Sequence, residues 1–494
     1  MTNNNANKEN KKETKTLKSA EQQEKKHEKN KKINLSKSLA KDKFSKNIIT
    51  IRKTTVKRNK QKEKQNNRRI KKAEKVKDMP IFEDEQIVKK IHEFNTNGKK
   101  TICYFIDTFY PIVDGVVTVV DNYAKLMKNK YNIVICAPKH KQTTLESSDF
   151  FVLQSDSFYL KAQGYDYALP QLDPVFQRYI SLLKIDLIHI HSPFNMGSFG
   201  QQLAKQRKIP CVATFHSQYK RDFLEAVKSE MVASVMTKMI AGIYQKADLT
   251  LTMNSFSKNL MREYGIKRKI EILSNATSLV KKDFEPEKEK EILKKYKINT
   301  KKFNLLFIGR FVKVKNIYFI LDVLTELAQK NVDFNMIFMG YGPEMQKMKE
   351  YVSANSLNSK VIFTGKITDE DEKAVIIKNS NLLFFPSEYD TDGIVKAECA
   401  CYSVPSMCIK NSGAGCNIIN NENGFLIENN IEKTANILQK LIQNPGFVAK
   451  IGKKANSTIY ITWDYVGTKL EEYYSRLLNI KTKKFLSKLK RHKM

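Results

Sequence analysis

The sequence contains no run of about 18 uncharged apolar residues, so we expect no transmembrane helix. Its amino-terminal segment lacks the apolar stretch of a secretory signal peptide, so we expect no secretion. Cysteine is scarce: the chain has seven, an odd number, and most lie within apolar runs. Reduced, buried thiols are typical of a cytoplasmic protein, and we expect that compartment.

The sequence also lacks a recognisable metal-binding pattern. Cys399 and Cys401 are closer together than the cysteine pairs of zinc knuckles, and no matching pair of histidines follows them. We therefore expect no metal site.

Negative charge is in short supply. The chain has 87 Lys and Arg residues against 52 Asp and Glu residues, a formal net charge of +35. About half of this excess lies in residues 1–77, which hold about 27 basic and about 8 acidic residues. Such a surplus favours binding to polyanions, among them anionic lipid and nucleic acid, and says nothing about the fold.

The amino-terminal segment is also poor in aromatic residues. It cannot bury enough apolar surface to fold alone, so we predict that residues 1–79 form a disordered basic tail. Without aromatic side chains for base stacking, nucleic acid is an unlikely partner. We expect the basic tails at both ends, 1–79 and 481–494, to bind an anionic membrane surface. A tail that is merely solvated is the alternative.

From residue 101 onward, short apolar runs alternate with amphipathic helical stretches. Continuous runs of β-branched and aromatic residues suit strands that are buried on both faces of a parallel sheet. Two such series predict an α/β protein with two doubly wound, Rossmann-like domains that face a central cleft. The expected strands are 101–107, 132–138, 186–191, 210–216, 247–254 and 270–273 in the first series, and 303–309, 334–340, 360–365, 381–387, 405–410 and 423–428 in the second.

The changes in composition suggest boundaries for these parts. After the tail of residues 1–79, the predicted divisions are an amino-terminal Rossmann-like domain that binds the acceptor, a carboxyl-terminal one that binds the nucleotide sugar, a helix that returns to the first domain, and a second basic tail. Their expected ranges are 80–276, 277–458, 459–480 and 481–494.

Each series begins with a strand whose following loop carries candidate ligand-binding residues. In the first, Gly115 opens a helix after the loop TFYPIVDG, where backbone N–H groups can approach a phosphate or a sugar. In the second, Arg310 follows the strand and Lys315 comes five positions later. A guanidinium and an ammonium at that edge suit a diphosphate, although a solvated basic loop would look similar.

The segment FFPSEYDTDGIVKAECA (384–400) is the richest in candidate site residues. Asp390 lies in a loop after a strand, and Glu398 lies about one turn into the next helix. Two carboxylates so placed can accept hydrogen bonds from sugar and ribose hydroxyls. Between them, Gly393 and the N–H groups of Ile394 and Val395 begin the helix. The alternative is a surface loop with incidental acids.

Two histidines follow strand ends, His191 in HIHSPF and His216 in TFHSQY. A lone histidine is usually structural, but one just past the carboxyl end of a buried strand is well placed for a ligand. We favour His216 over His191.

Taken in order, these segments resemble the family-4 retaining glycosyltransferases of the GT-B fold. The likeness extends over about residues 100–478. The pieces that carry it are DTFYPIVDGV, DLIHIHSPF, VATFHS, IGRFVKVKN, MGYGPE, VIFTGKI and PSEYDTDGIVKAEC.

The resemblance implies a role for each candidate on the donor side. Gly115 matches the glycine-rich loop near the donor diphosphate, and Arg310 and Lys315 match the pair that holds the phosphates. The backbone of Gly365, Lys366 and Ile367 matches the loop that contacts the base.

The resemblance also implies catalytic residues. His216 matches the histidine beside the transferred sugar. Asp390 and Glu398 match two acids, the first facing the hexose and the second the ribose, with the amides from Gly393 to Val395 between them. The chain departs from the family pattern at Asp390, where glutamate is usual, and at Ala276. Further departures are Asp114 and Cys416.

The implied activity is hexosyl transfer from a nucleotide-diphosphate sugar, with UDP-glucose as the first guess. It retains the anomeric configuration without a clear protein nucleophile and needs no cofactor and no metal. The first motif and the aromatic stretch 158–172 look most like members that glycosylate membrane lipids such as diacylglycerol. An enzyme of this kind is cytoplasmic and peripheral on the inner face of the membrane.

Two other functions remain open from the sequence. One is a transferase for a polysaccharide or a soluble acceptor, and the other is a degenerate enzyme whose basic tail binds polyanions.

Overall fold

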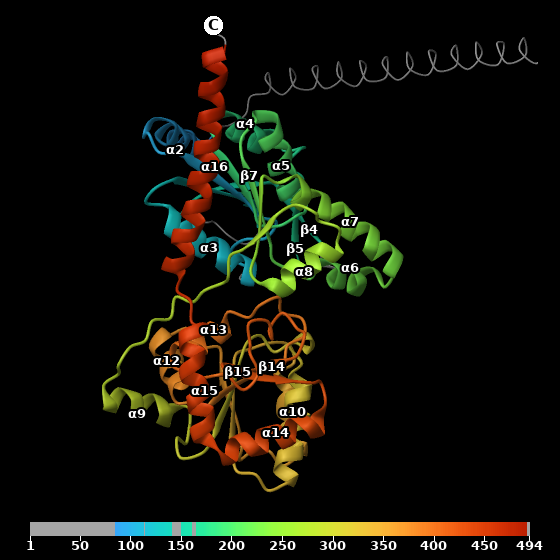
Figure 1. The fold of residues 1–494 in the computed structure, drawn as a ribbon, viewed down its shortest axis with the longest axis vertical. Coiled ribbons are helices and arrows are strands. Elements are labelled where there is room, and N and C mark those ends of the chain that lie inside the picture. The colour runs from blue at the N-terminus through green and yellow to red at the C-terminus, as the bar shows by residue number, and fades with distance from the viewer. Residues whose placement is uncertain (1–83, 113, 141–149, 161–164, 492–494) are drawn as a thin grey trace, which may run out of the picture. The chain divides into compact units, whose positions relative to one another are not determined.

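The structure is a computed structural model that describes residues 84–112, 114–140, 150–160 and 165–491 (Figure 1). The tail predicted for residues 1–79 lies outside the described residues, as do residues 492–494 of the second predicted tail. None of the described helices combines the length and the apolar character that crossing a membrane requires.

The amino-terminal domain is built on a seven-stranded sheet with the order β3-β2-β1-β6-β7-β8-β9. All of its pairings are parallel. An antiparallel hairpin of β4 (Ser157–Leu160) and β5 (Tyr165–Ala168) stands beside it. The sheet strands are β1 (Thr101–Phe105), β2 (Asn132–Pro138), β3 (Phe151–Ser155), β6 (Leu187–Ile190), β7 (Cys211–Phe215), β8 (Leu249–Thr252) and β9 (Ile270–Ile272).

Helices cover both faces of this sheet, as the alternation of side chains along β1 shows. Cys103 and Phe105 belong to the apolar cluster on one face, and Ile102 and Tyr104 to the cluster on the other. A strand buried on both faces has no polar side to place in solvent, which explains its continuous apolar sequence. The helices are α2 (Glu85–Thr96), α3 (Gly115–Met127), α4 (Pro174–Leu182), α5 (Asn195–Arg207), α6 (Tyr219–Val227), α7 (Glu230–Lys246) and α8 (Ser255–Glu263).

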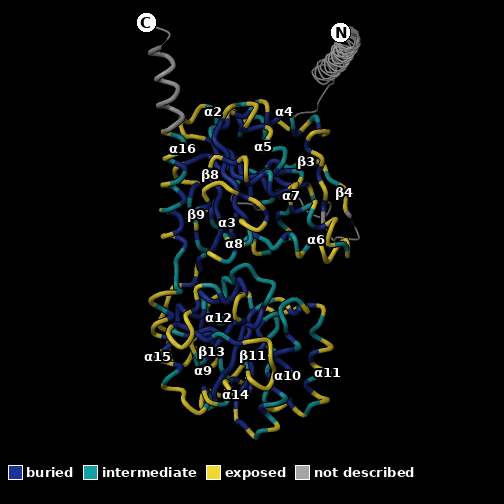
Figure 2. Tube along the Cα trace, turned by 45° about the vertical axis from the view of Figure 1, so that its right-hand side comes forward, coloured by how far each residue is buried: buried dark blue, intermediate teal, exposed yellow. Residues whose placement is uncertain are grey.

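The carboxyl-terminal domain repeats the design with a six-stranded parallel sheet in the order β12-β11-β10-β13-β14-β15. Its strands are β10 (Asn304–Ile308), β11 (Asn335–Met339), β12 (Val361–Gly365), β13 (Leu382–Phe385), β14 (Ser406–Ile409) and β15 (Gly424–Ile427). Its helices are α9 (Pro286–Lys295), the short 3₁₀ helix η1 (Lys313–Lys315), α10 (Ile317–Gln329), α11 (Met345–Ala354), α12 (Glu370–Lys378), α13 (Val395–Cys401), α14 (Ile431–Gln443) and α15 (Pro445–Thr458). Figure 2 shows the buried residues gathered along the strands of both domains.

The predicted fold class is confirmed: two doubly wound α/β domains are present, and each of the twelve expected strands is found. Three strands were not expected from the sequence, namely β3, β4 and β5. β3 carries Gln154 and two serines within or beside its apolar residues, so it did not stand out as an apolar run.

The last helix, α16 (Trp463–Arg491), packs on the amino-terminal domain. Trp463, Val466 and Leu470 are buried in the same apolar cluster as Ile102 of β1. The sequence predicted a helix within residues 459–480 followed by a basic tail, but the helix continues to Arg491. No glycine or proline interrupts residues 479–491, so nothing in the local sequence stops the helix there.

The chain passes between the two domains at two places that lie side by side. The N–H of Thr277, on the first crossing, donates to the carbonyl of Ile461 on the second at 3.0 Å. Thr277 and Thr462 also form a parallel β-bridge. Residues almost two hundred positions apart are thereby joined.

Tyr474 of α16 connects this helix to the histidines at the ends of the strands. Its hydroxyl is buried, lies 2.6 Å from Nδ1 of His189 and donates to the hydroxyl of Tyr104 at 3.2 Å. The other nitrogen of His189 lies 2.7 Å from the hydroxyl of Thr214. A buried ring with both nitrogens paired contributes to stability, because a lost partner cannot be replaced by water.

We therefore expect Tyr474→Phe to destabilise the protein by about 1–3 kcal/mol, since it leaves Nδ1 of His189 buried without a partner. The measurement is the urea midpoint of unfolding. Tyr465→Phe is the control, because Tyr465 lies on the same helix with an exposed fraction of 59%. Equal midpoints for the two variants would show that the Tyr474 hydroxyl contributes nothing.

Candidate active site

The structure brings two of the predicted site residues into contact at the carboxyl edge of the second sheet. Lys315 ends η1, after β10, and Asp390 lies in the loop after β13. The ammonium of Lys315 donates to both carboxylate oxygens of Asp390, at 2.5 and 2.6 Å. Because β10 and β13 are parallel neighbours, their following loops meet at one edge. Arg310, at the same edge, is exposed.

Glu398 lies in the middle of α13, where its carboxylate is only half used. One oxygen, Oε1, accepts from the ammonium of Lys373 at 2.7 Å. The other, Oε2, is buried and has no hydrogen-bond partner among the described residues. A buried carboxylate oxygen without a donor costs free energy, so this atom is a candidate acceptor for a ligand hydroxyl.

The turn between the two acids is shaped by Gly393. Its φ of 90° is rare for residues with a side chain, and a Cβ there would lie 2.9 Å from the ring of Phe385. Ile394 follows, and Val395 begins α13. Glycine is therefore required at this position for two independent reasons, space and backbone conformation.

Lys396 is a buried charged residue near the candidate site that the sequence did not indicate. It is 3% exposed, and its ammonium donates to the carbonyls of Ala414 at 2.7 Å and Cys416 at 3.3 Å. It also lies 3.4 Å from the carboxylate of Asp392. Lys396 thus ties the loop NSGAGC to the start of α13. The sequence showed only that Lys396 lies four residues after Asp392, at the start of a helix that also carries Glu398.

The base-contacting loop predicted from the resemblance follows β12. Gly365 ends the strand with a φ of 74°, and its carbonyl accepts from the N–H of Gly340 at 3.0 Å. Lys366 is exposed, whereas Ile367 is partly buried against the core of this domain.

In the amino-terminal domain, Gly115 begins α3 in open space, since no atom lies within 4 Å of where a Cβ would be. The preceding Asp114 caps the helix: its carboxylate accepts from the N–H groups of Val116 and Val117, both at 2.8 Å. Two of the amide groups that the sequence offered to a phosphate or sugar are therefore already bound by the chain's own carboxylate.

Asp107 has a similar structural task. Its carboxylate accepts from the N–H groups of Met196 at 2.8 Å and Phe194 at 3.2 Å, near the start of α5. Burial raises its pKa to about 6, although these hydrogen bonds act in the opposite direction.

His216, after β7, contacts the loop that carries Asp390. The hydroxyl of Thr391 donates to the backbone carbonyl of His216 at 2.7 Å. Nearby, the side-chain amide of Gln218 donates to the carbonyls of Glu388 at 3.1 Å and Tyr389 at 2.6 Å. These hydrogen bonds join the two domains. Because Thr391 is the residue that follows Asp390, they also bring His216 close to Asp390.

His191 is paired with His216, which the sequence did not reveal. Nδ1 of His191 lies 3.3 Å from Nε2 of His216, and Nε2 of His191 is buried without a hydrogen-bond partner among the described residues. His189 lies on the other side, with its ring centroid 4.0 Å from that of His191. The three imidazoles form a buried row that ends at the candidate site.

Burial keeps these imidazoles neutral. It lowers the pKa of His216 to about 3 and holds the pKa values of His189 and His191 well below the usual range, where the neighbouring imidazoles add to the effect. His216 is therefore a neutral hydrogen-bonding group at physiological pH.

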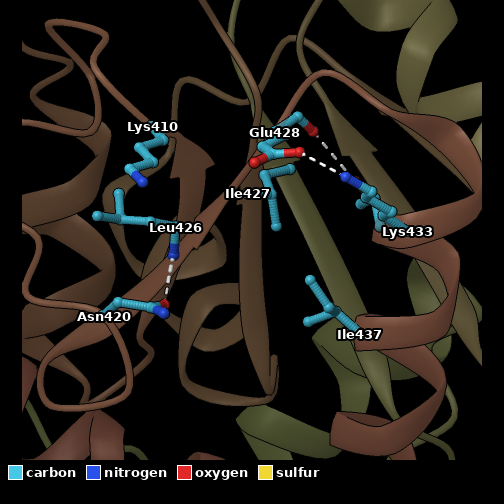
Figure 3. A pocket seen from close by; sticks show the side chains of 8 residues that line it. Lys410, Asn420, Leu426, Ile427, Glu428, Lys433 and Ile437 are labelled. Atoms are coloured by element: carbon cyan, nitrogen blue, oxygen red, sulfur yellow. Dashed lines mark hydrogen bonds and ion pairs between the residues drawn. The ribbon is translucent and has the colours of Figure 1, made fainter.

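A hollow of about 340 Å³ lies elsewhere in the carboxyl-terminal domain, between β15 and α14 (Figure 3). Glu428 and Lys433 form an ion pair of 3.0 Å across it, and Ile437 and Leu426 line its apolar part. It contains none of the predicted site residues, so we do not assign the reaction to it. Among the described residues, no group of three or more His, Cys, Asp or Glu could hold a metal ion.

Comparison with known protein families decides the kind of enzyme. Residues 113–280 match the model of "Glycosyltransferase Family 4", and residues 288–458 match that of "Glycosyl transferases group 1". The chain belongs to the GT-B glycosyltransferases. The two matches fall on the two Rossmann-like domains, so this glycosyltransferase carries both halves of the enzyme.

Named relatives and solved structures agree with this assignment. The alpha-monoglucosyldiacylglycerol synthase of Streptococcus pneumoniae is 24% identical over 69% of this chain and 78% of its own length. That of Acholeplasma laidlawii is 21% identical over 78% and 99%. The HepE protein of Anabaena in complex with UDP is 16% identical, with a TM-score of 0.62 over 76% of this chain and 100% of its own. Sucrose-phosphate synthase from Thermosynechococcus elongatus is 18% identical, with a TM-score of 0.63 over 77% and 100%.

We expect Arg310→Ala and Lys315→Ala each to weaken binding of the nucleotide-sugar donor about 10- to 150-fold, because the resemblance implies that each residue contacts the diphosphate, and a lost charge-assisted hydrogen bond costs about 1.5–3 kcal/mol. Isothermal titration calorimetry measures this directly. Lys313→Ala is the matched control, since Lys313 lies in the same short helix and is exposed. Donor affinity that is unchanged in Arg310→Ala would reject the assignment.

The buried histidines predict a loss of stability in mild acid. An unfolded histidine binds a proton below a pH of about 6.5, whereas folded His216 does so only near its pKa of about 3. Stability is therefore present above pH 6.5 and is lost as the pH falls toward 3, by about 1.4 kcal/mol per pH unit for each such histidine. Asp107, with its raised pKa of about 6, offsets part of this loss.

The measurement is the urea midpoint at pH 7.5 and at pH 5.5. His216→Gln should reduce the difference between the two midpoints, whereas His92→Gln should not, because His92 is exposed. A midpoint that is independent of pH in the wild-type protein would contradict the neutral, buried state of the row.

Proposed function

We propose that this glycosyltransferase transfers glucose from UDP-glucose to a hydroxyl of a membrane lipid such as diacylglycerol, with retention of the anomeric configuration. The observation that carries the donor side is the pair of lysine–carboxylate contacts at one sheet edge, Lys315 with Asp390 and Lys373 with Glu398. UDP in the HepE complex and the names of the two diacylglycerol glucosyltransferase relatives support the choice of donor and acceptor.

The proposed reaction assigns a task to each charged group. Arg310 and Lys315 stabilise the negative charge that develops on the departing nucleoside diphosphate. For this, Lys315 exchanges the carboxylate of Asp390 for a phosphate oxygen when the donor binds, which frees Asp390 to accept a hydrogen bond from a hexose hydroxyl. The unpaired Oε2 of Glu398 accepts a hydrogen bond from a ribose hydroxyl. Neutral His216 forms a hydrogen bond with the sugar and carries no charge that would oppose the positive charge growing at the anomeric carbon.

A second acceptor class, a polysaccharide or a soluble alcohol, uses the same donor site. The acceptor therefore has to be settled by product analysis. We favour a lipid because two relatives that match most of this chain are named alpha-monoglucosyldiacylglycerol synthase. No cofactor and no metal are part of the proposed reaction.

The test is turnover of the purified full-length protein with UDP-glucose and diacylglycerol in vesicles. We expect release of UDP, and we expect the lipid extract to contain a product with the mass of diacylglycerol that carries one glucosyl group. Proton NMR of that lipid should show the small coupling constant of an α-anomer, which means retention. Substitution of a soluble sugar for the lipid should give little UDP.

Variants of the two neighbouring acids provide the control. Glu398→Gln should lower kcat/KM about 10- to 150-fold, because it weakens a charge-assisted hydrogen bond to the donor. Asp392→Asn should have a small effect, since the carbonyls of Ala414 and Cys416 still hold Lys396. Equal losses in both variants, or no glycolipid from folded protein with any donor, would overturn the proposal.

A further inference from the structure

Helices α6 and α7 carry a set of apolar side chains that the fold leaves in solvent. Two methionines of α7 are the most exposed of them, Met231 at 76% and Met239 at 72%. A methionine that contacts the core would be buried, so these positions are not part of the packing of the domain. We name the set the α6–α7 stripe; its members are Leu224, Val227, Met231, Val232, Val235 and Met239.

The stripe is a continuous face of α7 and not a random scatter. Met231, Val235 and Met239 are spaced by four residues, so they lie one above the other on one side of the helix. The opposite side of α7 is the one that packs on the domain, and it includes Ala233, Thr237, Ile240, Ala241 and Tyr244. The helix is therefore apolar on two sides, of which the fold uses one.

Exposed aromatic side chains extend the stripe toward the β4–β5 hairpin. The ring of Phe194, which is 38% exposed, contacts that of Phe223 in α6 at a centroid distance of 6.2 Å. Its neighbour Asn195 accepts from the hydroxyl of Tyr167 in β5 at 3.4 Å, and the ring of Tyr167 packs at a tilt on that of Phe158 in β4, with a centroid distance of 5.5 Å. Figures 1 and 2 both draw α6 beside this hairpin.

Lysines that flank the α6–α7 stripe indicate the kind of partner that it binds. Lys238 is exposed three residues after Val235, Lys246 is exposed seven residues after Met239, and Lys228 lies two residues before the start of α7. Among the described residues, no carboxylate forms an ion pair with any of the three. Cationic side chains interleaved with flexible apolar ones suit the interface of an anionic bilayer, where the ammonium groups meet lipid phosphates and the apolar groups enter the acyl region.

The stripe also lies close to the candidate active site. Gln218, just before α6, donates to the carbonyls of Glu388 and Tyr389, and the hydroxyl of Tyr389 donates to Asp222 of α6 at 2.6 Å. A membrane bound along α6 and α7 would therefore lie next to the loop that carries Asp390.

We propose that the α6–α7 stripe, together with the β4–β5 hairpin, is a membrane-docking surface that inserts its apolar side chains into an anionic bilayer. It is distinct from the basic tails and binds by apolar insertion as well as by charge. The idea that this surface presents a lipid hydroxyl to the site rests on the proposed lipid acceptor. Membrane docking by the surface does not depend on that proposal.

The test is flotation of the full-length protein with two kinds of vesicle, phosphatidylglycerol mixed with phosphatidylcholine in equal parts, and phosphatidylcholine alone. The variant is the triple change Met231→Asp, Val235→Asp and Met239→Asp, which alters only exposed positions and so preserves the fold. Ile419→Asp is the matched control, because Ile419 is 54% exposed in the other domain. Each sample is also measured in about 0.5 M salt, which screens the electrostatic attraction of the tails.

We expect the triple variant to lose at least tenfold in binding to the anionic vesicles, a loss that remains in high salt, while Ile419→Asp binds as the wild type does. Changing Lys228, Lys238 and Lys246 together to Glu should reduce the preference for anionic over neutral vesicles and leave only the part that the basic tails supply. Wild-type protein that does not float, or a triple variant that floats equally well, overturns the proposal. A triple variant that turns from dimer to monomer without losing vesicle binding also overturns it, because the stripe then contacts a second copy.

A second readout separates this proposal from the proposed function. With dioctanoylglycerol in detergent micelles the triple variant should release UDP at the wild-type rate, whereas with diacylglycerol in vesicles it should be at least tenfold slower. Vesicle binding that depends on the stripe, in a protein that makes no glycolipid, would reject the lipid acceptor and retain the docking surface.

Discussion

The parallel pairing of β10 with β13 is the constraint on which the candidate site depends. Lys315 and Asp390 are 75 residues apart in the chain, yet the loops after two neighbouring parallel strands emerge at the same edge. The contact needs no special local sequence, because the crossover helices that parallel pairing requires bring it about. The same rule applies in the first domain, where His191 follows β6 and His216 follows its neighbour β7.

The strands could be predicted because burial on both faces forces an apolar sequence. Leu305 and Leu306 of β10, for example, are both fully buried although they point to opposite faces. β4 and β5 escaped prediction because an exposed hairpin needs no such sequence, and Phe158 and Tyr159 are indeed exposed.

Pairings between distant residues could not be predicted from spacing alone. Lys373 is 25 residues from Glu398, and sequence distance gives no sign that their side chains meet. The burial of Lys396 was hidden for a different reason. Its partners are backbone carbonyls, and any residue in the loop could supply those. The sequence thus indicated which residue types line the site, but it could not reveal which charges are already neutralised by one another.

That neutralisation changes how the donor must bind. The ammonium of Lys315 already contacts Asp390 at 2.5 Å, so a phosphate can bind to it only by replacing that carboxylate. Each partner released needs a new one, or a partly buried charge is left without a partner. A hexose hydroxyl is the group that can satisfy Asp390, which means that the diphosphate alone and the intact nucleotide sugar are not equivalent ligands for this edge.

The paired crossings at Thr277 and Ile461 have a mechanical consequence. Because both connections between the domains lie side by side and are hydrogen-bonded to each other, they define one axis about which the domains would rotate. A rotation about that axis would change backbone angles in only a few residues and would leave both hydrophobic cores intact. The contacts that such a rotation would break include the interdomain hydrogen bonds of Thr391, Gln218 and Tyr389, so polar groups hold the two domains together on the side away from this axis.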